Sequence, residues 1–130
     1  MGIVEYTQFL IDNGIDFFAV STVEEALKLR NSGIKERVLM LSSTAIKEDV
    51  KKLVENNITL TLGSKEAVSM AEEVADELNK KINAHIKIDT GFGRYGFVYN
   101  DRDEMIKVLK ELKNIKVQGT FTHFEGIIIW

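Results

Sequence analysis

The feature that most constrains the fold is a regular alternation of short apolar runs with amphipathic helical segments. Five runs are expected to be strands, and they cover residues 16–20, 37–42, 58–62, 82–90 and 115–124. The first four begin roughly every 21 to 24 residues, with apolar positions at helical spacing between them. Strands joined by helical crossovers run parallel, so the sequence predicts an α/β fold with a parallel sheet.

Strands as uniformly apolar as these need helices against their exposed faces. Two architectures satisfy that need, an open doubly wound sheet and part of a (βα) barrel, and the residue pattern alone leaves both open. At 130 residues the chain is one domain's worth of sequence and is short for a complete barrel. No linker or low-complexity segment marks an internal domain boundary.

Several helix starts carry capping signals. The segment Thr22-Val-Glu-Glu25 matches a capping box, in which the first hydroxyl and the last carboxylate each bind a free backbone N–H. Ser64 is expected to cap the longest helix. The pair Ser43-Thr44 is expected to cap the helix that follows the second strand.

Composition excludes several function classes. The formal net charge is −3, so no bulk electrostatic attraction to nucleic acid or to an anionic membrane is expected. The absence of Cys excludes disulfides, thiolate metal sites and a cysteine nucleophile, and two His leave little for metal binding. No apolar run approaches the roughly 20 residues of a membrane helix, and the N-terminus lacks a signal-peptide pattern. We expect a soluble cytoplasmic protein.

The fourth strand runs into the segment IKIDTGFGRYGF, residues 86–97, in which three glycines surround Arg94. Glycine allows positive φ and close backbone approach, so the segment can hold Arg94 near the end of the strand. Its G-x-G-x-x-G-x-V spacing also fits the dinucleotide fingerprint and the glycine-rich loop of kinases. Neither context fits, because four strands precede the segment and only about thirty residues follow it. A tight turn without chemistry is the other interpretation.

Three polar side chains at strand ends, those of Arg94, Lys87 and His123, are candidates for function. The planar guanidinium of Arg94 suits a phosphate, a carboxylate or a phenolic oxygen, and its alternative is solvent. Lys87 alternates with apolar neighbours, so it faces either a barrel interior or a helix layer and needs a partner, for which Asp89 is nearest. His123 closes the last strand, where functional groups of parallel sheets collect. His85 is expected to be packed or solvated.

The segments FFAVSTVEEALKLRNSGI, RVLMLS, IKIDTGFGRYGF and GTFTHF together resemble the N-terminal domain of alanine racemase. The resemblance covers residues 1–124 and leaves 125–130 as an aberrant apolar tail, which looks like a truncation, a frameshift scar or a fused tag. The family has a barrel that binds pyridoxal 5'-phosphate, followed by a β-rich domain, and works as a homodimer. The resemblance therefore implies a partial (βα)8 TIM-type barrel with about five strands, in a homo-oligomer.

The resemblance also implies roles for three residues. Arg94 matches the arginine beside the phenolic oxygen of the cofactor and the carboxylate of the substrate. Lys87 matches the lysine, carbamylated in some members, that positions this arginine. His123 matches the barrel histidine of the hydrogen-bond network that reaches the pyridine side of the cofactor. Cationic donors at strand ends suit an anionic cofactor and an amino-acid carboxylate.

The family's Schiff-base lysine lies in a K-x-N-A-Y-G motif just before the region that this chain resembles, and the opposite base is a tyrosine of the C-terminal domain. Neither is in this sequence. We therefore expect a fragment of an alanine racemase that is inactive alone, whose intact parent uses pyridoxal 5'-phosphate to interconvert L- and D-alanine for the cell wall. The resemblance does not extend cofactor binding to this chain by itself. The alternatives are a related amino-acid racemase and a non-catalytic module whose open strand edges pair with another chain.

Overall fold

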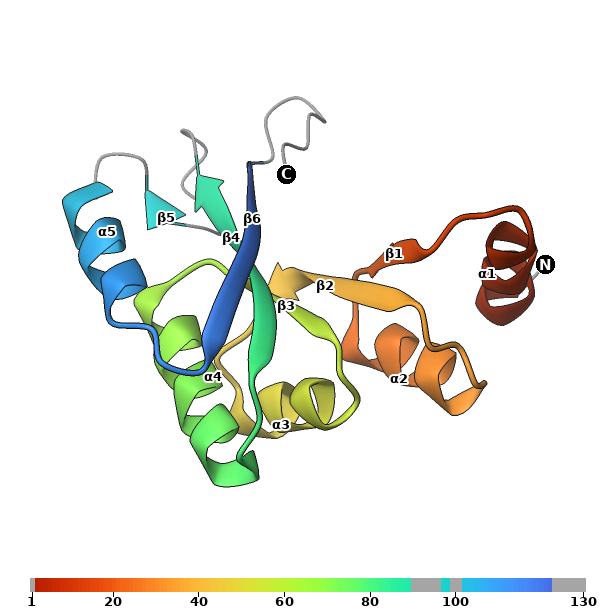
Figure 1. Ribbon diagram of the computed structural model, residues 1–130, viewed down its shortest axis with the longest axis horizontal. Coiled ribbons are helices and arrows are strands. Elements are labelled where there is room, and N and C mark those ends of the chain that lie inside the picture. The colour runs from red at the N-terminus through yellow and green to blue at the C-terminus, as the bar shows by residue number, and fades with distance from the viewer. Residues whose placement is uncertain (1, 90–96, 99–101, 123–130) are drawn as a thin grey trace.

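The computed structural model describes residues 2–89, 97–98 and 102–122 as a single sheet with helices around it (Figure 1). The strands are β1 (Phe17–Val20), β2 (Arg37–Ser43), β3 (Thr59–Leu62), β4 (Ile82–Asp89), β5 (Phe97–Val98) and β6 (Ile115–Thr122). The helices are α1 (Ile3–Asp12), α2 (Val23–Asn31), α3 (Lys47–Glu55), α4 (Lys65–Leu78) and α5 (Arg102–Lys110). None of these helices has the length and apolar character needed to cross a lipid bilayer.

The sheet runs in the order β1-β2-β3-β4, and both β5 and β6 pair with β4. Every described strand pair is parallel, which confirms the predicted α/β architecture. The five predicted strands correspond to β1, β2, β3, β4 and β6. The sixth strand, β5, is an addition that the sequence did not predict, because two residues are too short to carry a periodic signal. In Figure 1, α1 and α5 lie at opposite ends of the molecule.

The two faces of the sheet differ in what covers them. On one face, apolar side chains alternate along each strand and join the helices in one core, with Val38, Leu60 and Ile86 nearly or fully buried. Along this face α2 contacts α3, and α3 contacts α4. The opposite face carries Leu39 and Thr61, which are also buried but do not belong to that core. The sheet therefore encloses its second face by curvature, as a partial barrel does.

The capping predictions had mixed outcomes. Thr22 accepts a hydrogen bond from the Glu25 N–H at 3.1 Å in a complete capping box, and Ser64 accepts one from Ala67 at 3.1 Å. The predicted Ser43-Thr44 cap is wrong. Strand β2 extends through Ser43, and the N-cap of α3 is Ile46, which has no side-chain cap.

Arg30 holds together the loops at the amino ends of the strands. Its Nε donates to the carbonyl oxygen of Asn56 at 2.8 Å, and Nη2 donates to that of Asn57 at 3.2 Å. Its Nη1 donates to the carbonyls of Ile34 and Glu36, each at 2.8 Å. One guanidinium therefore satisfies carbonyls of the α2–β2 and α3–β3 connections, which a planar donor array can do and a single ammonium cannot.

Replacing Arg30 with Met should lower the free energy of unfolding by about 2 kcal/mol, because four carbonyls lose a charged donor and only partly regain water. Chemical denaturation of the full chain measures this change. Lys28→Met, an exposed cation of the same helix, is the matched control and should change stability by less than about 0.5 kcal/mol. Equal losses in the two variants would contradict the role of Arg30.

Candidate functional site

Three strands bring their carboxyl ends to one edge of the sheet. Strands β4 and β6 run side by side until Ile88 lies opposite Thr122. Strand β5 pairs with the end of β4, with Ile88 opposite Phe97 and Asp89 opposite Val98. The carboxyl edge of a parallel sheet is where α/β proteins place their ligands and catalytic groups, so this edge is the candidate site.

Lys87 lies near the end of β4, on the face of the sheet opposite the core that the strands share with the helices. Its neighbour Ile86 is fully buried in the core shared with the helices, and side chains alternate along a strand. The structure thereby selects the barrel interior over the helix layer for Lys87, which is half-buried there. Its predicted pairing with Asp89 involves a side chain outside the described part of the chain, and its role stays a prediction.

Arg94 and His123, the other two predicted site residues, lie outside the described residues. In the sequence, Arg94 lies between the end of β4 at Asp89 and the start of β5 at Phe97, and His123 directly follows the end of β6 at Thr122. The structure therefore places one of the three predicted residues, and it places the strands that lead to the other two at a common edge.

His85 is packed, one of the two outcomes that the sequence left open. It is 4% exposed, and its ring meets that of Phe17 edge-on, with 6.2 Å between centroids and 84° between planes. The guanidinium carbon of Arg37 lies 4.7 Å from the centroid of the same Phe17 ring. Sequence reasoning missed Phe17 and Arg37, because they come from β1 and β2 and only the tertiary fold brings them to His85.

The environment of His85 favours the neutral imidazole. Burial lowers the pKa of His85 below its ordinary value of 6.5, and the positive charge of Arg37 lowers it further. A neutral ring beside Phe17 adds apolar contact area inside the barrel without adding a charge there.

Two serine hydroxyls connect neighbouring strand ends at the candidate edge. The Ser42 hydroxyl donates to the Ser21 carbonyl at 3.1 Å, and the Gly63 N–H donates to the Ser43 hydroxyl at 3.0 Å. These bonds link the end of β2 to the loops that follow β1 and β3. Sequence reasoning assigned Ser43 to a helix cap, and the signal that it overlooked was a polar residue continuing the strand period of β2.

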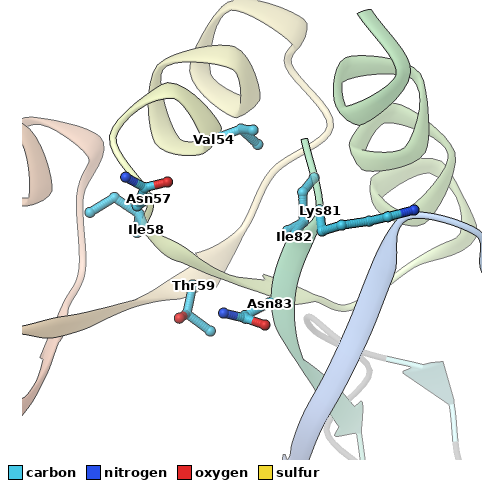
Figure 2. A pocket seen from close by; sticks show the side chains of 7 residues that line it. All are labelled: Val54, Asn57, Ile58, Thr59, Lys81, Ile82 and Asn83. Atoms are coloured by element: carbon cyan, nitrogen blue, oxygen red, sulfur yellow. The ribbon is translucent and has the colours of Figure 1, made fainter. Parts of the chain in front are cut away.

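The described residues also form a small pocket at the opposite edge, shown in Figure 2. Its volume is about 50 Å³, and its walls include Thr59 and Asn83, which lie at the amino ends of β3 and β4. A position at the amino edge is typical of stability rather than catalysis in barrels. Across the described ranges, no three His, Asp or Glu side chains come together as metal ligands.

Acid should destabilise the chain through His85. Because the pKa is lowered in the folded state, the unfolded chain binds the proton more readily, and stability falls as pH drops below 6.5. Thermal unfolding at pH 7.5 and pH 5.5 should show a larger loss for the natural chain than for His85→Gln. An identical pH dependence in the two proteins would refute this contribution; the comparison cancels the carboxylates that both share.

Comparisons with known proteins extend over nearly the whole chain. Residues 1–126 match the family described as alanine racemase, N-terminal domain. The chain is 41% identical over 124 residues to an alanine racemase of Methanococcus maripaludis, and 42% identical over 123 residues to one of Carboxydothermus hydrogenoformans. Each match covers 95% of this chain and 33% of the relative. The chain thus spans about a third of the length of these relatives.

Solved structures give the same result. An alanine racemase of Clostridium difficile 630 superposes with a TM-score of 0.84 at 34% identity, over 95% of this chain and 32% of that one. A histidine racemase of Leuconostoc mesenteroides superposes with a TM-score of 0.81 at 27% identity, over 95% and 33%. The partial parallel barrel and the family match agree along the chain, and the protein belongs to the alanine racemase N-terminal domain family.

Proposed function

We propose that this chain is the barrel portion of a pyridoxal-phosphate-dependent racemase that interconverts L- and D-alanine. The observation that carries the proposal is the position of Lys87, half-buried on the interior face at the carboxyl end of β4, directly before the D-T-G-F-G-R segment. A cation partly withdrawn from water at this edge suits an anionic cofactor. Membership of the family supports the same assignment.

The residues of this chain act as donors around the reacting groups. Arg94 would bind the phenolic oxygen of the cofactor and the carboxylate of the amino acid, because its planar fork offers several N–H groups to oxygen acceptors. Lys87 would fix the direction of Arg94, and His123 would contribute to the hydrogen bonds on the pyridine side. When bound, pyridoxal phosphate supplies the electron sink that lets the α-proton leave.

Proton removal and return need groups that this sequence does not contain. The 130 residues include no K-x-N-A-Y-G motif, which in the family carries the covalently bound lysine. We infer that the chain alone does not racemise, and that activity requires the rest of the parent protein in a cytoplasmic homodimer. The extent of the match, about a third of each relative, supports this division.

The substrate class is a free amino acid, and alanine is the preferred member. Relatives at 41% and 42% identity are named alanine racemase, whereas the histidine racemase is 27% identical. The second candidate is therefore a racemase for a larger amino acid. Because the barrel shares the site with groups outside this chain, the choice between these substrates needs a complete enzyme.

A chimaera tests the proposal directly. Residues 2–122 would replace the matching third of the Methanococcus maripaludis relative, and racemisation of L-alanine and L-histidine would be followed by chiral chromatography. We expect alanine turnover. Arg94→Ala should lower kcat by about 100-fold or more, and Lys87→Met by about 10- to 100-fold through misplacement of Arg94.

Lys52→Met, an exposed lysine of α3, is the control and should leave turnover unchanged. A folded chimaera that racemises histidine and not alanine would favour the second candidate. A folded chimaera whose Arg94→Ala and Lys87→Met variants keep full activity would remove these residues from the site.

The chain by itself should not attach the cofactor covalently at a specific lysine. After incubation with pyridoxal phosphate and reduction by borohydride, peptide mapping should find no lysine labelled above the level of the denatured chain. A single lysine labelled stoichiometrically, with the absorbance band of a protein-bound cofactor before reduction, would contradict the inferred inactivity.

A further inference from the structure

The contact between Phe17 and His85 crosses the interior of the partial barrel. Phe17 belongs to β1 and His85 to β4, and both β2 and β3 lie between them in the sheet. Neighbouring strands lie about 4.8 Å apart, so β1 and β4 would be about 14 Å apart in a flat sheet. The ring centroids are nevertheless 6.2 Å apart. The sheet therefore curves enough for side chains from its two sides to meet over its middle strands.

This crossing closes one layer of the interior. Leu39 of β2 and Thr61 of β3 lie on the same face between the two rings, and they are 0% and 2% exposed. The Arg37 guanidinium also lies over the Phe17 ring. Packed interior layers leave little space for another side chain, so the layer formed by Phe17, Leu39, Thr61 and His85 acts as a floor.

Lys87 occupies the next layer toward the carboxyl edge. It follows His85 by two residues on the same face of β4, which separates their Cα atoms by about 6.6 Å along the strand. Its four-carbon side chain is long enough to fold back toward the amino end if the interior there were open. Phe17 is half-buried, and Leu39, Thr61 and His85 are buried, so the floor would hinder that direction and leave the side chain the carboxyl edge.

We propose that Phe17, acting through His85, is a positioning residue for Lys87: the floor that it completes directs the lysine side chain toward the carboxyl edge of β4. The consequence for Arg94 and the cofactor rests on the proposed function. The proposed direction of the lysine does not, since it is argued from the packing of described residues alone.

Nuclear magnetic resonance on the complete 130-residue chain, without cofactor, tests the proposal. In the natural chain, the Lys87 Hε protons should show no nuclear Overhauser contacts to the Leu39 or Thr61 methyl groups. Phe17→Leu shortens the side chain so that it no longer reaches His85, and Phe17→Ala opens the floor fully. Both variants should gain those contacts and shift the Lys87 Cε–Hε signal.

Phe18→Leu is the matched control. Phe18 is the next residue of β1, is 9% exposed, and points to the opposite face. This substitution should lower stability and leave the Lys87 signals where they are. The conservative Phe17→Leu decides the question if Phe17→Ala fails to fold.

The proposal is overturned if Lys87 already contacts Leu39 or Thr61 in the natural chain, a result that requires no variant. It is also overturned if Phe17→Leu leaves the Lys87 signals unchanged, or if Phe18→Leu shifts them as much. Because the sample contains no cofactor or substrate, failure here leaves the chimaera result untouched, and an inactive chimaera leaves the floor untouched.

Discussion

The structure depends on the two-sided pairing of β4. This strand bonds to β3 along one edge and to β6 along the other, and its Ile86 side chain is fully buried among the helices. A strand that is paired on both edges and buried on both faces has little freedom to move. Lys87 is carried by this strand, so a strand that is paired along both edges presents the candidate site. Precise placement of polar groups is easiest on such an element.

The sequence predicts the features that depend on residues close together in the chain, and it fails where residues distant in the chain decide the outcome. Strands β1, β2, β3, β4 and β6 and the Thr22 capping box produce local sequence patterns, and the sequence predicted them closely. The Ser43-Thr44 cap was predicted wrongly, because a serine after an apolar run suits both a cap and one more strand residue. Pairing to β3 decides between these two outcomes, and pairing is not visible in a local window.

The same limit applies to the candidate site. Alternation along β4 allowed two faces for Lys87, and only the burial of Ile86 against the helices assigned it to the interior. The floor beneath it combines residues from four strands, so no spacing in the sequence connects Phe17 with His85. The role of Arg94 came from a resemblance of motifs, whereas its residue type alone fitted any anionic ligand.

The clamp made by Arg30 implies a division between the two edges of the sheet. The Arg30 guanidinium donates to main-chain carbonyls in each of these four bonds. The amino-edge loops can therefore vary in sequence while their backbone path is kept. This clamp acts at the edge remote from the candidate site. The carboxyl-edge loops contain the candidate site, and substitutions there leave this clamp intact, with a smaller risk that the fold is lost.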